Sequence, residues 1–254
     1  METMTGILLT ENHGAVRVLT MNRPDKRNAL NTALTQALLD ALRAADDDRS
    51  VHCVVVAGAG PGFCAGADLS EFKDLTLDKQ HLVAARAQLT TDLHAIFSKM
   101  KKPVVTAIHG AAMGGGAGLA IAGDMAVMAE NAKLGYPEVK HGIVAAIVMT
   151  NLTRQLGRKA AFELVAMGQP ISAARALELG MVNRVVGDNE VMHETLAIAE
   201  QLASFSPAAM AATKETFHAV AELPFAEALE VGRRVNERMR AFRSQQAPLV
   251  DGKK

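Results

Sequence analysis

Two short apolar runs near the start of the chain, at residues 7–10 and 15–21, flank an Asn-His-Gly turn signal at 12–14. This pattern predicts a β-hairpin. Apolar residues then recur at helical spacing after Asn31, a residue type that favours helix N-termini, until three aspartates at 46–48. The pattern therefore predicts a hairpin followed by a helix that lies on a sheet.

The same alternation continues through the middle of the chain. Continuous apolar runs at 51–57, 104–108 and 125–129 are typical of strands buried on both faces, and residues 79–100 have a helical pattern. Glycine-rich loops follow the first two of these strands. Repetition of strand, loop and helix predicts right-handed crossovers and a largely parallel sheet covered by helices.

After Ala145 the pattern becomes mostly helical. The only later strand candidate is at 182–186, and Pro207 and Pro224 each stand where a helix could begin. Arginines cluster near the C-terminus; such a run usually faces water, and contact with a phosphate or a neighbouring subunit is the alternative. These arginines are Arg233, Arg234, Arg238, Arg240 and Arg243.

Composition restricts the class of protein. The chain has 254 residues, of which 49% are hydrophobic and 21% charged, as in ordinary globular proteins with a buried core. Twenty-seven Lys and Arg balance twenty-seven Asp and Glu. The overall charge therefore attracts neither nucleic acid nor an anionic membrane, and we expect neither as a partner.

The cysteines and one uncharged segment bear on the compartment. Cys53 and Cys64 provide neither a disulfide framework nor a metal-ligand spacing, and no secretory signal opens the chain. Residues 103–123 are uncharged and long enough to span a bilayer, but they contain six glycines and His109. They are better explained as a strand and a turn into a helix, so we expect a cytoplasmic protein without a membrane span.

The first glycine loop, at 58–68, contains a spacing found in dinucleotide-binding loops, at Gly60, Gly62 and Ala65. That fingerprint normally also has an acidic residue about 20 residues on, at the end of a second strand. Here residues 80–89 have a helical pattern. A nicotinamide enzyme is therefore disfavoured, and the P-loop, nucleophile-elbow and zinc-helix motifs are absent from the sequence.

The second glycine loop, at 109–118, ends one strand and opens a helix. A helix start has unpaired backbone N–H groups and a partial positive charge, so it can stabilise a developing oxyanion. Glycines also occur where strand and helix simply pack closely. The residues of this loop alone leave both interpretations open.

Together, the two loops resemble those of the enoyl-CoA hydratase/isomerase, or crotonase, family. Residues 63–69 read Phe-Cys-Ala-Gly-Ala-Asp-Leu, and residues 110–116 read Gly-Ala-Ala-Met-Gly-Gly-Gly. Further segments match in family order, so the resemblance covers nearly the whole chain. These segments are 22–24, 28–30, 123–124, 132–138, 168–172 and 176–182.

The resemblance implies an α/β fold built as a spiral of repeated ββα units, similar to that of ClpP, with a helical C-terminal trimerisation region. It divides the chain into a crotonase core with an acyl-CoA site at 1–198 and a helical oligomerisation region at 199–254. It further implies a homotrimer or homohexamer. Coenzyme A enters as the thioester substrate, and no metal or other cofactor is expected.

The resemblance also assigns a catalytic site. The backbone N–H groups of Ala67 and Gly115 form the oxyanion hole, and Glu138 is the acid/base. The residues by themselves allow a surface glutamate at a helix start for Glu138. The family's hydratases carry a further glutamate, and that position falls on Gly118. The residues expected to contact the nucleotide and pantetheine parts of coenzyme A are Arg27, Ala29, Ala65, Asp68 and Leu69.

A single carboxylate favours movement of a double bond, because one base can remove a proton from C2 and return it at C4. We therefore expect conversion of 3-enoyl-CoA to 2-enoyl-CoA. The alternatives are a 2-enoyl-CoA hydratase or hydratase-lyase and a non-catalytic acyl-CoA-binding protein. His141 is expected to be structural or supporting, Tyr136 could donate to substrate or simply pack, and the apolar stretch 142–148 could line an acyl chain or lie in the core.

Overall fold

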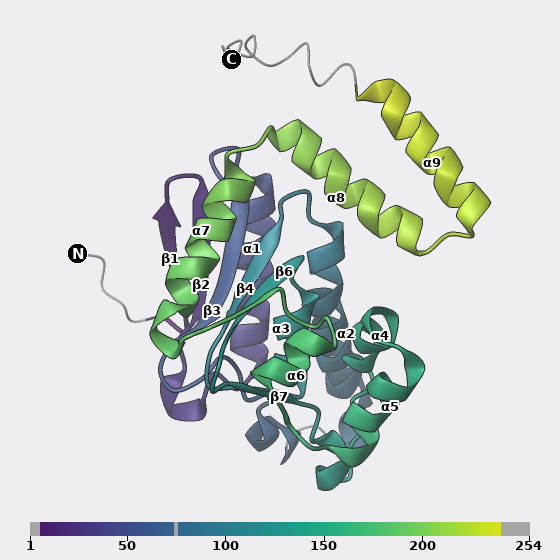
Figure 1. Cartoon of the computed structure of the whole chain (residues 1–254). Helices are drawn as coiled ribbons and strands as arrows, with labels where there is room; N and C mark the ends of the chain where they lie inside the picture. Colours follow the sequence, from purple (N-terminus) through teal and green to yellow (C-terminus); the bar gives the residue numbers. More distant parts are fainter. Residues whose placement is uncertain (1–5, 74–75, 240–254) are drawn as a thin grey trace.

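A six-stranded sheet forms the centre of the molecule (Figure 1). The computed structural model describes residues 6–73 and 76–239. The first two strands form an antiparallel hairpin, and every later neighbouring pair in this sheet is parallel. In spatial order the strands are β1 (Leu8–His13), β2 (Val16–Met21), β3 (Cys53–Gly58), β4 (Val104–Ile108), β6 (Met125–Ala129) and β9 (Arg184–Val186).

A smaller sheet consists of β5 (Ala111–Met113), β7 (Lys133–Gly135) and β8 (Ile171–Ser172). Its parallel alignment is extended by bridges between Cys64 and Ala112 and between Leu30 and Ala67. Each turn of the chain thus gives one strand to the large sheet and one extended segment to the small layer. This repetition is the spiral expected from the sequence.

Helices cover both faces of the large sheet. α7 contacts β2, β3, β4 and β6, whereas α1 and α3 contact strands from behind in the view of Figure 1. The helices are α1 (Thr32–Asp47), α2 (Gln80–Lys99), α3 (Gly115–Ala122), α4 (Met149–Gln155), α5 (Arg158–Met167), α6 (Ala173–Glu178), α7 (Val191–Ala203), α8 (Pro207–Ala221) and α9 (Phe225–Arg238). Short 3₁₀ turns are η1 (Pro24–Lys26), η2 (Leu69–Lys73), η3 (Leu77–Lys79), η4 (Glu138–His141) and η5 (Asp188–Glu190).

Local sequence explains the start of α1. The Asn31 side chain accepts a hydrogen bond from Leu34 N at 2.9 Å, which satisfies one of the unpaired donors of the first turn. Leu34, Leu38 and Leu42 are fully buried on the inner face of the helix. The expected hairpin, helix and parallel sheet are confirmed.

The 103–123 segment forms β4, β5 and the short helix α3. Within the described residues, no helix is both long and apolar enough to cross a bilayer. The prediction of a single strand after Ala145, at 182–186, was wrong, because β8 also lies in that part of the chain. At two residues, β8 is too short to show a periodicity.

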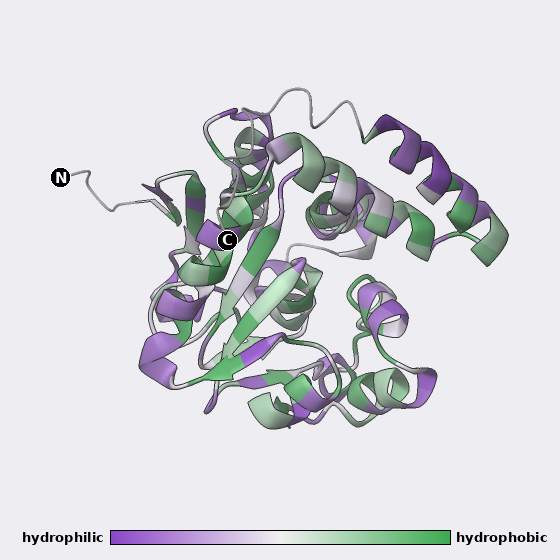
Figure 2. Cartoon of the chain, turned by 45° about the horizontal axis from the view of Figure 1, so that its top comes forward, coloured by the Kyte–Doolittle hydropathy of each residue, from purple (hydrophilic) through white to green (hydrophobic). Residues whose placement is uncertain are grey.

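The last two helices extend from the core as an arm (Figure 1). Pro207 is the first residue of α8, and Pro224 caps α9. Lys214 anchors the arm, since its buried ammonium donates to Asp124 Oδ2 at 2.7 Å and Lys102 O at 2.8 Å. α9 has purple, hydrophilic residues beside green ones, whereas the central strands are largely green (Figure 2).

The division expected at residue 198 falls inside α7, which packs on the large sheet. A division between α7 and α8 therefore agrees better with the observed contacts. Residues 240–254 of the expected oligomerisation region, including Arg240 and Arg243, lie outside the described residues.

Candidate active site

The loop after β3 presents an unpaired backbone donor. Leu30 N donates to Gly66 O at 2.7 Å, and Asp68 N donates to Leu30 O at 3.2 Å. Ala67 lies between these bonds in a parallel bridge, so its own N–H points to the opposite side. This N–H has no acceptor within the described part of the chain. Ala67 is exposed, and its N–H is available to a ligand.

The N-terminus of α3 lies beside this donor. A methyl group built on Gly115, the first residue of the helix, would lie 3.8 Å from Ala67 N. Gly115 N also lacks an acceptor among the described residues, as expected for the first turn of a helix. Two backbone donors and the positive end of α3 therefore meet at one point, which is the arrangement that stabilises an oxyanion.

Glycine is required on both sides of this point. Gly66 has φ +90°, and a methyl group there would lie 2.6 Å from Met113 O. Gly114 has φ +54° and ψ −121°, a conformation that residues with a Cβ rarely adopt. The loop after β3 and the start of α3 can approach each other because neither residue carries a side chain.

Glu138 reaches the same region from the start of η4. A methyl group on Gly114 would lie 2.8 Å from Glu138 Oε1, so the carboxyl group lies against the residue that precedes Gly115. Glu138 Oε2 is buried and has no hydrogen-bond partner within the described residues. Burial raises the pKa of Glu138, and a backbone hydrogen bond to the carboxylate partly opposes this shift.

The position that lacks the family's other glutamate is closed by neighbouring side chains. A methyl group on Gly118 would lie 2.7 Å from Val148 Cγ1 and 2.8 Å from His94 Cε1. His94 belongs to α2 and is buried, and neither ring nitrogen has a hydrogen-bond partner among the described residues. Burial lowers the pKa of His94 from 6.5 to about 4, so the imidazole is neutral near pH 7.

Two residues and one apolar stretch singled out in the sequence near Glu138 differ in exposure. Tyr136 is fully buried with an unpartnered hydroxyl, and burial followed by the charge of Glu138 raises its pKa. His141 is exposed. In the apolar stretch 142–148, Ala145 and Val148 are buried whereas Val144 is 73% exposed. This stretch therefore contributes both to the core and to the surface.

Asn28 connects the segments that lead to the site. Its buried amide nitrogen donates to Ala59 O at 2.8 Å, Gly62 O at 2.9 Å and Phe63 O at 3.2 Å. Its side-chain oxygen Oδ1 accepts a hydrogen bond from Arg23 N at 2.9 Å. Asn28 thereby fixes the first glycine loop against the 23–30 segment.

The residues expected to contact coenzyme A border this junction. Arg27, Ala65 and Leu69 are exposed, Ala29 is partly exposed, and Ala65 N donates to Arg27 O at 2.9 Å. Asp68 differs, because its buried side chain is already engaged.

Asp68 accepts from Ser70 Oγ at 2.6 Å and from Arg23 Nη2 at 2.9 Å. The hydrogen bond from Ser70 and that from Arg23 lower the pKa of Asp68. Arg23 also donates to Ala29 O. The Asp68 side chain thus holds the loop in place and is not free for a ligand.

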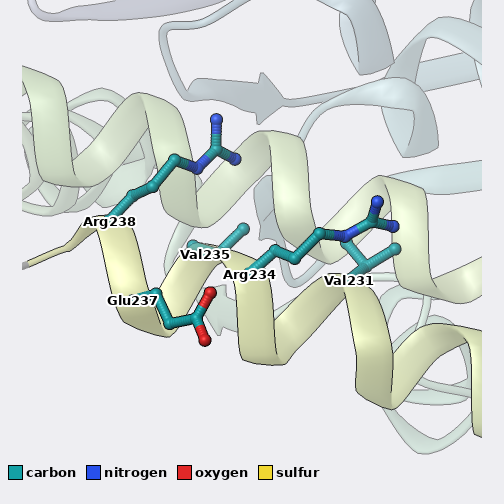
Figure 3. A pocket seen from close by; sticks show the side chains of 5 residues that line it. All are labelled: Val231, Arg234, Val235, Glu237 and Arg238. Atoms are coloured by element: carbon teal, nitrogen blue, oxygen red, sulfur yellow. The ribbon is translucent and has the colours of Figure 1, made fainter.

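A surface hollow on α9 is separate from these residues. It is lined by Val231, Arg234, Val235, Glu237 and Arg238, and Figure 3 shows the two arginines extending from the helix beside the two valines. All five residues belong to a single helix of the arm. The hollow contains none of the residues that surround Glu138.

Neither cysteine is a nucleophile candidate. Cys53 and Cys64 are free and buried, and burial raises the pKa of each thiol to about 12. In residues 6–73 and 76–239, no three His, Cys, Asp or Glu side chains are placed to hold a metal ion.

The structure brings Ala67, Gly115 and Glu138 together. Sequence reasoning missed His94 near this site and the role of Asn28. The one signal for His94 is its place beside Leu93 in the buried stripe of α2, where a polar residue is unusual.

Comparisons with known proteins show the family of the chain. The family model described as enoyl-CoA hydratase/isomerase matches residues 11–249. A Rhizobium meliloti protein named "Probable enoyl-CoA hydratase" is 38% identical over 245 residues, which cover 96% of this chain and 93% of that protein. The 2,3-dehydroadipyl-CoA hydratase of Escherichia coli is 35% identical over 209 residues, 82% of this chain and 80% of that protein.

A solved structure gives the same result in three dimensions. The enoyl-CoA hydratase of Mycobacterium smegmatis superposes with a TM-score of 0.86 at 30% identity, covering 96% of this chain and 98% of that one. Sequence and fold thus agree over almost the full length described. The chain belongs to the enoyl-CoA hydratase/isomerase family.

Proposed function

We propose that this protein adds water to 2-enoyl-CoA thioesters, with Glu138 as the acid/base and the N–H groups of Ala67 and Gly115 as the oxyanion hole. The names of the relatives favour hydration over isomerisation. The observation that carries the proposal is the buried Glu138 Oε2, which has no partner among the described residues, near two unpaired backbone donors.

The chemistry follows from this arrangement. The thioester carbonyl oxygen accepts hydrogen bonds from Ala67 and Gly115. Glu138 takes a proton from water while the water oxygen bonds to C3, and the electrons of the C2–C3 double bond move toward the carbonyl as an enolate. The Glu138 carboxylic acid then returns the proton to C2, so that one H and one OH have been added.

The environment of Glu138 suits both steps. A carboxylate with a raised pKa is a stronger base than an exposed glutamate, and it retains the proton taken from water until that proton passes to C2. Fixed donors stabilise the enolate without reorganising, and loss of one such donor typically costs about 3 to 4 kcal/mol of barrier. This route uses no metal or redox cofactor.

Isomerisation of 3-enoyl-CoA, the reaction expected from the sequence, is the second candidate. Gly118 favours it, because this position carries no carboxylate and lies against Val148 and His94. Glu138 alone could then move a proton from C2 to C4.

The test is to incubate the purified protein with a 2-enoyl-CoA and, separately, with a 3-enoyl-CoA, and to resolve the products by mass and chromatography. Hydration adds one water to the 2-enoyl substrate, and Glu138→Gln abolishes the addition. Conversion of the 3-enoyl substrate without water addition favours the isomerase. Bound CoA thioester without turnover of either substrate favours a non-catalytic binder.

Two further expectations also stay proposals. We infer that the arm packs against other copies of the chain as a trimer or hexamer, since Phe217, Phe225 and Leu229 on α8 and α9 are 68%, 79% and 59% exposed. Leu229→Asp is expected to lower the mass observed by analytical ultracentrifugation. A cytoplasmic location remains a prediction.

A further inference from the structure

All the buried side-chain N and O atoms that lack a hydrogen-bond partner in the described part of the chain belong to three residues. They are both ring nitrogens of His94, the Tyr136 hydroxyl and Glu138 Oε2. A buried polar group without a partner is costly, so such groups are rare in folded proteins. Two of these residues, His94 and Glu138, lie against α3, which indicates a place that takes up polar ligand atoms or water.

His94 and Glu138 flank successive turns at the start of α3. Glu138 lies against Gly114, and His94 lies against Gly118. Gly118 N donates to Gly114 O at 2.9 Å, so the two glycines are one helical turn apart, about 6 Å along the axis. The imidazole and the carboxylate therefore both lie against the first two turns of this helix.

The orientation of the ring supports the same conclusion. The atom of His94 nearest to the missing Gly118 side chain is Cε1, which is bonded to both Nδ1 and Nε2. The nitrogen-bearing edge of the ring therefore faces α3. A neutral imidazole can donate through one nitrogen and accept through the other, and a water molecule matches both.

We propose that His94 provides the polar group that the family's other glutamate provides elsewhere, and that its ring hydrogen-bonds the water that adds to C3. This inference rests on the proposed hydration. Glu138 takes the proton from this water and later gives it to C2. His94 orients the water and keeps its own protonation state, so atoms and charge balance as before.

The test compares His94→Leu, His94→Gln and the wild type in two reactions. The first is hydration of a 2-enoyl-CoA. The second is exchange of the C2 hydrogens of butyryl-CoA in D₂O, which uses Glu138 and the oxyanion hole but no attacking water. His81→Leu, at an exposed position on the same helix, is the matched control.

His94→Leu is expected to lower kcat for hydration about 10-fold or more, as for loss of a hydrogen bond to a reacting atom, and to leave C2 exchange within about threefold. His94→Gln recovers part of the hydration rate. Because leucine removes two unpartnered nitrogens, this variant should unfold at the same or higher urea concentration. Equal hydration rates in His94→Leu and wild type overturn the proposal, as does an equal loss in both reactions.

A second readout needs no turnover. The ring ¹⁵N signals of His94, assigned by their absence in His94→Leu, are expected to shift when butyryl-CoA binds. Unchanged signals on saturation mean that the ring holds only a structural water and overturn the proposal. If the wild type adds no water to any 2-enoyl-CoA, the proposed function fails by itself, and these shifts still decide whether His94 faces the acyl site.

Discussion

Gly118 is the position at which the structure makes its sharpest quantitative prediction. Family resemblance alone suggests that Gly118→Glu would restore a missing carboxylate and improve hydration. The structure predicts the opposite, because the first added atom already meets Val148 Cγ1 at 2.7 Å and Val148 Cβ at 2.8 Å. Contacts between carbon atoms are normally about 3.5 to 4.0 Å.

The cost can be estimated with the smaller variant Gly118→Ala. Overpacking by one methyl group costs about 1 to 3 kcal/mol, whereas alanine in place of glycine inside a helix returns about 0.5 to 1 kcal/mol. Val148 Cβ is fixed to the backbone and cannot swing away, so the cost lies in the upper part of this range. The expected loss of unfolding free energy is about 1 to 2 kcal/mol, and Gly118→Glu loses more because its carboxylate enters a buried place.

The assay is urea unfolding of Gly118→Ala. Unfolding is monitored by far-UV circular dichroism, because the chain has no tryptophan whose fluorescence could report on it. Gly232→Ala is the matched control, since Gly232 lies inside α9 and a methyl group there has no atom within 4 Å among the described residues. The control should be as stable as wild type or slightly more so. Val148→Ala combined with Gly118→Ala should recover part of the loss. If Gly118→Ala is as stable as wild type, a methyl group at position 118 does not overpack against Val148, and the prediction is wrong.

Three further predictions concern buried polar groups. Asn28→Ala removes an amide group whose two N–H donors reach three carbonyl oxygens, and it is expected to lower the unfolding free energy by about 3 kcal/mol and to raise KM for acyl-CoA, as denaturation and initial rates can show. Lys214→Met leaves Asp124 without its ammonium partner and is expected to cost about 2 to 3 kcal/mol, less than the 3 to 5 kcal/mol of a fully buried pair; an unchanged Tm would contradict this. Because folding lowers the pKa of His94 from 6.5 to about 4, wild type should lose about 3 kcal/mol as pH falls from 6.5 to 4, a loss that unfolding curves of His94→Leu should lack.

Long apolar periodicities predicted much of the fold. β4 and β6 have the bounds expected from their apolar runs, and α2 differs from the expected helix by one residue at each end. The small sheet was not predicted. β5, β7 and β8 have two or three residues each, which is too few for any period to appear, and they are specified by pairing with one another.

The candidate catalytic residues were identified through the resemblance, because no spacing in the sequence relates Ala67 to Gly115 or either to Glu138. Their proximity arises from the Leu30 bridge and the turn at Gly114. His94 could not be found in this way. A histidine within a helix forms no motif, and its approach to Gly118 depends on how α2 packs on α3.

The proposed function depends on the transfer of a proton by Glu138 during water addition. The most direct measurement is kcat/KM for hydration of a 2-enoyl-CoA by wild type and Glu138→Gln at one pH, with Glu130→Gln at an exposed site as control. We expect a decrease of about 10² to 10⁴-fold for Glu138→Gln and no change for the control. Hydration by Glu138→Gln within twofold of wild type would contradict it.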